Sequence, residues 1–349
     1  MSRRAAAALA AALALGTAGG AGARPAAAAR PLSIVQLGDS VASGEGTLYG
    51  YRYDRAARQW TGGRLDAPWP GPYPACHVSP DAYGGVVARA LGARFTTFAC
   101  TGASYANGVV APQVRTDLFG SSTLRPAQFG DWSSRRDLNA AYDAARPDVV
   151  LVTLGADDVR FAPVVTDCVE NAFAARFGVE GLRCTAANPG PTIAADVTAN
   201  LAAVGPHLDA LVTAVRARGQ AAGRVPKVVV TLYHDPFPAG PTRCPDVALL
   251  DPAQAAYLRA LVPRLNATIR AALTGRAGVV VADTSAAMKG ADGRDHRWCS
   301  AAPWAYGLSI FRARDPASVL SQAPFHPTPD GQRRFAALVA PVVRRVLGR

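Results

Sequence analysis

The sequence contains no C-x-x-C pair, no internal repeat and no Pro/Ser-rich linker. Structural zinc sites place their ligands at such short spacings, so the first absence argues against a zinc site. Without a linker or a repeat, the roughly 320 residues that follow an N-terminal segment of about 30 are expected to form one domain, residues 31–349, with long loop insertions. Beyond that segment, no apolar run approaches the ~20 residues of a membrane-spanning helix.

Blocks of lysine and arginine are also missing, although the formal net charge is +12. Arg3 and Arg4 contribute two of these charges, so a chain that has lost them carries +10. Because the basic residues are dispersed and few aromatic residues lie among them, the pattern argues against nucleic-acid binding. A basic surface favours anionic envelope polymers or, as a peripheral membrane contact, lipid headgroups.

The first 30 residues have the pattern of a secretory signal peptide with a short tail. Arg3 and Arg4 precede an apolar run from Ala5 to Leu15, and Ala21-Gly22-Ala23 is an Ala-x-Ala cleavage site. We expect cleavage near Ala23, with residues 27–29 as the second choice, and a secreted, extracellular, monomeric product. A membrane anchor is disfavoured because the run is short, and the paired arginines leave the twin-arginine route open beside general secretion.

Six cysteines lie in the exported part of the chain. They are Cys76, Cys100, Cys168, Cys184, Cys244 and Cys299. An even number of cysteines in an oxidising compartment predicts disulfide bonds.

A buried strand beginning near Ile34 leads into the Gly-rich turn Gly38-Asp39-Ser40. The apolar run predicts the strand, and the small residues after it predict a tight turn at its carboxyl end. Open α/β sheets bind ligands at that end of their strands. Ser40 is therefore a candidate catalytic residue, although Gly-Asp-Ser is also ordinary turn chemistry.

Four further strands are expected, at residues 93–99, 148–154, 227–232 and 278–282, and helical patterns lie between them. Five helices are expected: one that starts at Ser79-Pro80-Asp81, three over residues 138–145, 192–218 and 251–273, and one that follows Asp330. The helix over residues 192–218 is expected to break at Gly205-Pro206. This alternation predicts an α/β fold, a three-layer α/β/α sandwich with five mostly parallel strands.

Residues 49–75 and 106–131 show no sustained period and are expected to be irregular loops. Four aromatic residues of the first loop, Tyr51, Tyr53, Trp60 and Trp69, either line a substrate groove or pack the loop. A third irregular stretch, residues 165–191, has the form of an insertion closed by a disulfide bond.

Four short motifs resemble the conserved blocks of the SGNH (GDSL-type) hydrolases, in particular secreted actinobacterial esterases and lipases. The first is Gly38-Asp39-Ser40, followed by Ser43-Gly44-Glu45-Gly46. The others are Cys100-Thr101-Gly102-Ala103-Ser104, Gly155-Ala156-Asp157-Asp158, and Phe325-His326-Pro327 followed by Asp330-Gly331-Gln332. They occur in the order of the family and span most of the chain after the leader. The family has a flavodoxin-like sheet, in agreement with the fold predicted above.

The resemblance implies a role for each matching residue. Ser40 would be the nucleophile and His326 its general base, a pair that serine needs because its free hydroxyl is a weak nucleophile. The oxyanion hole would consist of the backbone N–H groups of Ser40 and Gly102, with Asp157 at its third position. Secreted relatives also imply sequential disulfides, Cys76–Cys100, Cys168–Cys184 and Cys244–Cys299.

Two positions depart from the family pattern. Asp157 stands where the family has an asparagine, and an ionised carboxylate cannot donate a hydrogen bond to an oxyanion. Ala323 stands where many relatives carry the aspartate that orients the histidine. The main-chain carbonyl of Ala323 is expected to hold His326 instead, as a backbone acceptor can.

Other residues compete for these roles. His234 follows a strand and is a rival general base, although its Pro and Phe neighbours favour loop packing. Asp283, Asp292 and Asp295 are alternative acids for orienting the histidine.

Three functions from different classes follow. We expect a secreted serine hydrolase that cleaves carboxylic esters of lipids or acylated sugars, with no cofactor and no metal. The alternative is a catalytically weakened domain that binds envelope glycan or lipid. A metal-dependent phosphoesterase that uses Asp39, Asp158, His234 and His326 lacks the ligand spacing of such sites.

Overall fold

A computed structural model describes residues 30–63, 68–117, 120–129, 136–165, 168, 191–238, 252–307 and 324–349. The predicted signal segment, residues 1–29, lies outside them. By its internal contacts the chain divides into two compact units, Met1–Arg30 and Pro31–Arg349. The second unit contains the helices and strands that the structure describes.

A five-stranded parallel sheet forms the centre of this unit. Its strands are β1 (Ser33–Gly38), β4 (Arg94–Thr97), β7 (Val149–Thr153), β8 (Lys227–Thr231) and β9 (Val279–Ala282), in the order β4-β1-β7-β8-β9. All five predicted strands are therefore confirmed. β1 and β7 are buried throughout, as is typical of parallel strands that are covered on both faces, and β1 buries Gln36 along with its apolar residues.

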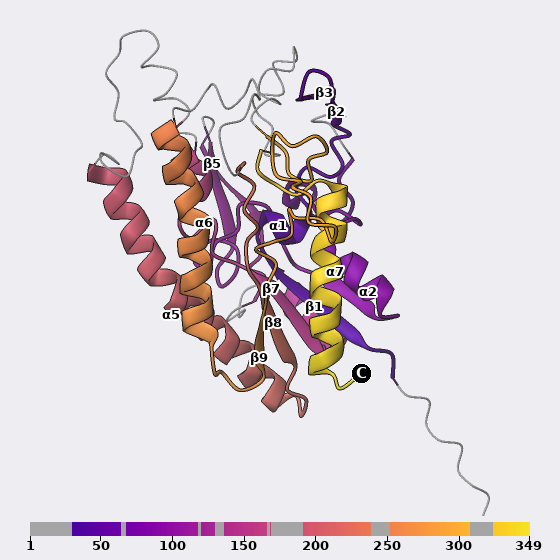
Figure 1. The fold of residues 1–349 in the computed structure, drawn as a ribbon. Helices are drawn as coiled ribbons and strands as arrows, with labels where there is room; N and C mark the ends of the chain where they lie inside the picture. Colours follow the sequence, from indigo (N-terminus) through magenta and orange to yellow (C-terminus); the bar gives the residue numbers. More distant parts are fainter. Residues whose placement is uncertain are drawn as a thin grey trace, which may run out of the picture. The chain divides into compact units, whose positions relative to one another are not determined.

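Helices cover both faces of the sheet. Figure 1 shows α5 (Pro191–Ala221) and α6 (Pro252–Leu273) on one side, and α2 (Tyr83–Ala90) and α7 (Pro329–Val346) on the other. Helix α3 (Arg136–Ala145) contacts β1, and two short segments, α1 (Ser40–Ser43) and η1 (Pro74–Cys76), lie between strands and longer helices. The predicted α/β/α layering is thus confirmed.

Three local predictions were wrong. The first two expected loops contain β-hairpins, β2 (Arg52–Asp54) with β3 (Gln59–Thr61) and β5 (Gln113–Asp117) with β6 (Gly120–Arg125). Helix α5 runs through Pro206 without a break. Its buried face, which includes Val204, Leu208 and Leu211, offsets the backbone hydrogen bond that proline cannot make.

The start of α2 also differs from the expectation. The helix begins at Tyr83, and Ser79 instead closes a turn by accepting a hydrogen bond from the backbone N–H of Asp81 at 3.1 Å. None of the helices among the described residues has the length and apolar character needed to cross a membrane.

The aromatic residues of the first loop pack together. Trp60 and Trp69 are buried in one cluster with Tyr49 and Tyr306, and Tyr51 and Tyr53 pack against it. Of the two interpretations left open for this loop, packing therefore accounts for these side chains. Because Tyr306 is distant in the sequence, the cluster ties Tyr49, Trp60 and Trp69 to the segment that carries Tyr306.

The order of the strands places Ser40 at the switch point of the sheet. Counted along the sheet, β4-β1-β7-β8-β9 corresponds to the 2-1-3-4-5 arrangement of flavodoxin-like folds, in which ligands bind where the strand order reverses. That point lies between β1 and β7. Ser40 follows β1 and Asp157 follows β7, so both lie at this switch point.

Candidate functional site

The turn after β1 presents Ser40 as the first residue of a short helix. Gly38 has φ +144°, and a Cβ there would lie 2.2 Å from the carbonyl oxygen of Thr153, so only glycine fits. Asp39 caps α1, its Oδ1 accepting a hydrogen bond from the N–H of Val41 at 3.0 Å. Gly44, at φ +85°, ends α1 in the left-handed conformation. These constraints hold Ser40 at a sharp bend.

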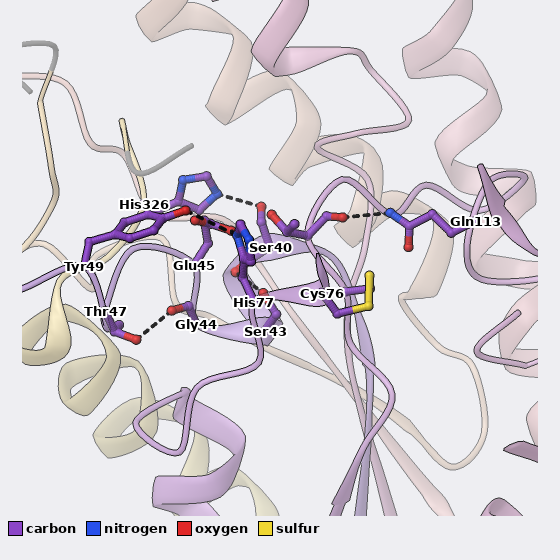
Figure 2. Close-up of polar contacts among 12 residues, drawn as sticks. Ser40, Ser43, Gly44, Glu45, Thr47, Tyr49, Cys76, His77, Gln113 and His326 are labelled. Carbon is purple, nitrogen blue, oxygen red and sulfur yellow. Dashed lines mark hydrogen bonds and ion pairs between the residues drawn. A yellow bond between two sulfur atoms is a disulfide. The ribbon is translucent and has the colours of Figure 1, made fainter. Parts of the chain in front are cut away.

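The imidazole of His326 meets the hydroxyl of Ser40. Nε2 of His326 lies 2.6 Å from Oγ of Ser40, although 286 positions separate the two residues (Figure 2). The backbone around His326 is fixed on both sides by Tyr306, whose carbonyl accepts from the N–H of Phe325 and whose N–H donates to the carbonyl of His326, both at 3.0 Å. The structure thus brings together the two residues that the sequence predicted as a catalytic pair.

The residue expected to orient His326 through its carbonyl, Ala323, lies outside the described residues. The three alternative acids bond elsewhere. Asp283 accepts from Arg270 and Ser285, Asp292 from the N–H of Arg294, and Asp295 from Arg297.

His234, the rival base, supports the backbone next to His326. Its ring is buried, and Nε2 donates a hydrogen bond to the carbonyl of Phe325 at 2.8 Å. Burial lowers the pKa of His234 to about 4, so the ring is neutral at ordinary pH. The interpretation of His234 as a packing residue therefore fits, and its hydrogen bond fixes the residue that precedes His326.

Two backbone N–H groups are open near the serine. Within the described part of the chain, neither Ser40 nor Gly102 uses its N–H in a hydrogen bond. Gly102 is exposed at φ +73°, and its loop is held beside β1 by a hydrogen bond of 3.0 Å from the N–H of Cys100 to the carbonyl of Gly38. Both groups are thus available for an oxygen atom of a substrate.

Asp157, at the third predicted oxyanion position, is the most unusual residue of the site. Its Oδ2 is buried and has no hydrogen-bond partner among the described residues. Burial, followed by the charges of Asp39 and Asp158, raises its pKa well above the ordinary value. The raised pKa favours the protonated form of the side chain, whose O–H can donate a hydrogen bond where an ionised carboxylate cannot.

Asp39 and Asp158 have structural partners of their own. Oδ2 of Asp39 accepts from the hydroxyl of Tyr233, which in turn accepts from the N–H of Ala156 at 3.0 Å. Burial raises the pKa of Asp39 to about 7. Asp158 accepts from the N–H of Tyr105 at 3.1 Å and pairs with His207 on α5. Asp158 therefore ties the segment after β7 to Tyr105 and to α5.

The four residues of the metal hypothesis therefore have different partners. In the described part of the chain, no group of three or more His, Cys, Asp or Glu side chains is placed to hold a metal ion.

A buried acid and a histidine that sequence reasoning gave no role lie beside Ser40. The carboxylate of Glu45 accepts a hydrogen bond from Nδ1 of His77 at 2.7 Å, and the hydroxyl of Tyr49 lies 3.3 Å from the same nitrogen (Figure 2). Glu45 belongs to the motif Ser43-Gly44-Glu45-Gly46, and this membership was the signal in the sequence that could have pointed to it. No pattern in the sequence pointed to His77.

One predicted disulfide is present in full. Cys76 and Cys100 are bonded and join η1 to the loop that carries Gly102. Cys168 and Cys299 are also disulfide-bonded. The partners predicted for them, Cys184 and Cys244, lie outside the described residues.

Comparison with known proteins identifies the family. A sequence model of the GDSL-like lipase/acylhydrolase family matches residues 37–334. No curated protein matches the sequence. Among solved structures, an extracellular lipase from Streptomyces rimosus is 20% identical, with 90% of this chain and 99% of the lipase covered at a TM-score of 0.51.

A phospholipase A1 from Streptomyces albidoflavus NA297 is 21% identical, with 90% of this chain and 99% of the phospholipase covered at a TM-score of 0.52. These two structures agree with the fold described above. Because the family match extends from the end of β1 into α7, the chain belongs to the GDSL-like lipase/acylhydrolase family and is an ester hydrolase.

Proposed function

We propose that this protein is a secreted serine hydrolase that cleaves carboxylic esters through Ser40 and His326. The observation that carries the proposal is the distance of 2.6 Å between Oγ of Ser40 and Nε2 of His326. A serine hydroxyl at hydrogen-bond distance from an imidazole is the minimal arrangement for nucleophilic catalysis on an acyl group.

The reaction begins with the attack of Oγ of Ser40 on the carbonyl carbon of the ester, while Nε2 of His326 takes the hydroxyl proton. The carbonyl oxygen becomes an oxyanion, which accepts hydrogen bonds from the N–H groups of Ser40 and Gly102 and from the protonated carboxyl of Asp157. When the intermediate collapses, His326 returns the proton to the leaving alcohol. Water then attacks the acyl-enzyme by the same route and releases the carboxylic acid.

The substrate class is an ester of a lipid or of an acylated sugar. The two similar structures are a lipase and a phospholipase A1, which favours lipid esters. The formal net charge of +10 that remains without Arg3 and Arg4 also supports this choice, because a basic protein attracts anionic headgroups.

Labelling by a serine-reactive fluorophosphonate separates the enzyme from a weakened binding domain. We expect the wild-type protein to be labelled and the Ser40→Ala variant to remain unlabelled. Asp157 stands where the family has an asparagine, and this difference is the feature that favours a weakened binding domain. Absence of labelling in a folded wild-type protein across several pH values would support the binding domain instead.

Export is proposed from the N-terminal segment and the disulfide bonds, which form in oxidising compartments. N-terminal sequencing of protein collected from the medium of an expressing bacterium is expected to give a chain that starts after Ala23. A protein that stays inside the cell and still begins at Met1 would overturn this part of the proposal.

A further inference from the structure

The carboxylate of Glu45 lies beside the Ser40–His326 pair, and the reaction described above gives it no task. Glu45 is completely buried, with 0% of its surface exposed. Its backbone N–H donates to the carbonyl of Ser40 at 3.0 Å, and the hydroxyl of Ser40 meets His326 at 2.6 Å. Tyr306 joins the same two segments, because its hydroxyl donates to the carbonyl of Gly46 and its N–H to the carbonyl of His326.

This carboxylate is ionised despite its burial. Burial by itself would raise the pKa of Glu45, but the hydrogen bond from His77 and the electrostatic interactions with the imidazoles of His77 and His326 outweigh it, so that the pKa lies below the usual value. An isolated charge in the interior costs several kcal/mol, and such groups are normally neutralised or paired. Glu45 therefore retains a negative charge at a place where His326 feels it.

His77 holds the carboxylate in position. It follows η1 at φ +49°, next to the Cys76–Cys100 disulfide, and its ring stacks on Trp69 with centroids 4.6 Å apart. Its Nδ1 donates to Oε2 of Glu45 at 2.7 Å. The disulfide, the stacked ring and the hydrogen bond together fix the buried acid. Figure 2 shows Glu45 among Ser40, His77 and His326.

We propose that Glu45 is a positioning residue for His326: its charge stabilises the imidazolium that forms when His326 takes the proton of Ser40. This inference rests on the proposed Ser–His function. The charge acts through space, because no hydrogen bond joins Glu45 to His326 in the described structure. An opposite charge favours the charged form of a neighbouring base, and it does so more strongly in a buried site than in water.

Other charged or titratable groups also face these residues. Among the described residues, the groups against His326 include Ser40 and the neutral His234, which donates to the adjacent carbonyl of Phe325. On the side of Glu45, they are His77 and Tyr306, whose pKa is raised, first by burial and then by the charges of Tyr51, Glu45 and Asp330. Of these groups, Glu45 is the one that supplies a buried negative charge to His326.

The test measures the rate of fluorophosphonate labelling against pH in the wild type, Glu45→Gln, His77→Gln and Asp283→Asn. Glutamine keeps an acceptor for His77 and removes the charge. In Glu45→Gln we expect the acid limb of the profile to move to lower pH by about one unit, and the plateau rate to fall roughly 10-fold, because a less stabilised imidazolium makes a weaker base.

The two control variants separate charge from structure. His77→Gln keeps the carboxylate, so its acid limb is expected to stay at or above the wild-type position. Asp283→Asn removes an exposed acid that bonds Arg270 and should reproduce the wild-type profile. If Glu45→Gln does not fold, the double variant Glu45→Met, His77→Phe removes the buried pair together, an exchange that proteins often tolerate, and the same shift is expected.

Each outcome decides one claim. An unshifted acid limb in a folded Glu45→Gln protein that still labels at Ser40 would overturn the role of Glu45 and leave the proposed hydrolase intact. A fall in thermal stability with an unchanged profile would likewise mean that Glu45 is only structural. Absence of labelling in the wild type would instead overturn the Ser–His function itself.

Discussion

Replacement of Ser40 by alanine is expected to lower kcat for an aryl ester by roughly 10⁵- to 10⁶-fold. The nucleophile disappears, and what remains is the binding of the ester and the hydrogen bonds to its carbonyl oxygen. His326→Ala should cost a comparable factor, because a serine hydroxyl without its base remains protonated and weakly nucleophilic.

The double variant tests whether the two residues act as a unit. Members of one catalytic unit are strongly non-additive, so Ser40→Ala, His326→Ala should be about as slow as either single variant. Ser285→Ala, at a serine that bonds Asp283 beyond β9, is the matched control and should keep the wild-type rate. Wild-type turnover in Ser40→Ala would assign the chemistry to another nucleophile. Additive losses of kcat in the double variant would mean that His326 does not act as a unit with Ser40.

Replacement of Asp157 by alanine is expected to lower kcat by roughly 10²- to 10³-fold, the cost of one lost oxyanion donor. Asp157→Asn should keep activity near pH 7 within a few-fold of the wild type, because the amide N–H replaces the acid O–H as a donor. The measurement is kcat for the aryl ester against pH in the three proteins.

The pH dependence gives the sharper signature of Asp157. The raised pKa favours the form of Asp157 that keeps its proton, whose O–H can donate a hydrogen bond, and ionisation removes this donor. Wild-type activity should therefore fall as the pH rises through this pKa, whereas Asp157→Asn should lack that alkaline limb. Asp39, Asp158 and Tyr233 face the same carboxyl, and an ionised Asp39 keeps Asp157 protonated because it disfavours a second negative charge nearby.

Two results would contradict this role. Wild-type kcat in Asp157→Ala would show that the carboxyl makes no contact with the oxyanion. An alkaline limb that persists unchanged in Asp157→Asn would assign that titration to another group. Asp283→Asn again serves as the control for the loss of an acid away from the site.

The sheet was predictable because its signals are local. The run that forms β7 is apolar from Val149 to Val152, and the run of β1 is broken only by Gln36 between Ile34 and Leu37; such runs are typical of parallel strands covered on both faces. The hairpins were not predictable in the same way. Their strands, such as Arg52–Asp54, are three to six residues long, carry polar side chains and become strands through their partners.

The site divides along a similar line. Ser40 follows strand β1, His326 precedes helix α7, and a short motif marks each of them. The Glu45–His77 contact has no such mark, because it depends on how η1 folds against the turn after β1. The raised pKa of Asp157 is also a product of the fold, since it arises from burial and from two other acids, Asp39, which is distant in the sequence, and Asp158, which is adjacent.

The most direct test of the central claim is the mass of the protein during turnover of a slowly deacylated aryl ester. The account predicts an added acyl group, located by peptide mapping on the peptide that contains Ser40, in the wild type and not in Ser40→Ala. An acyl group on a different residue, or turnover of the ester with no covalent intermediate at any time, would contradict it.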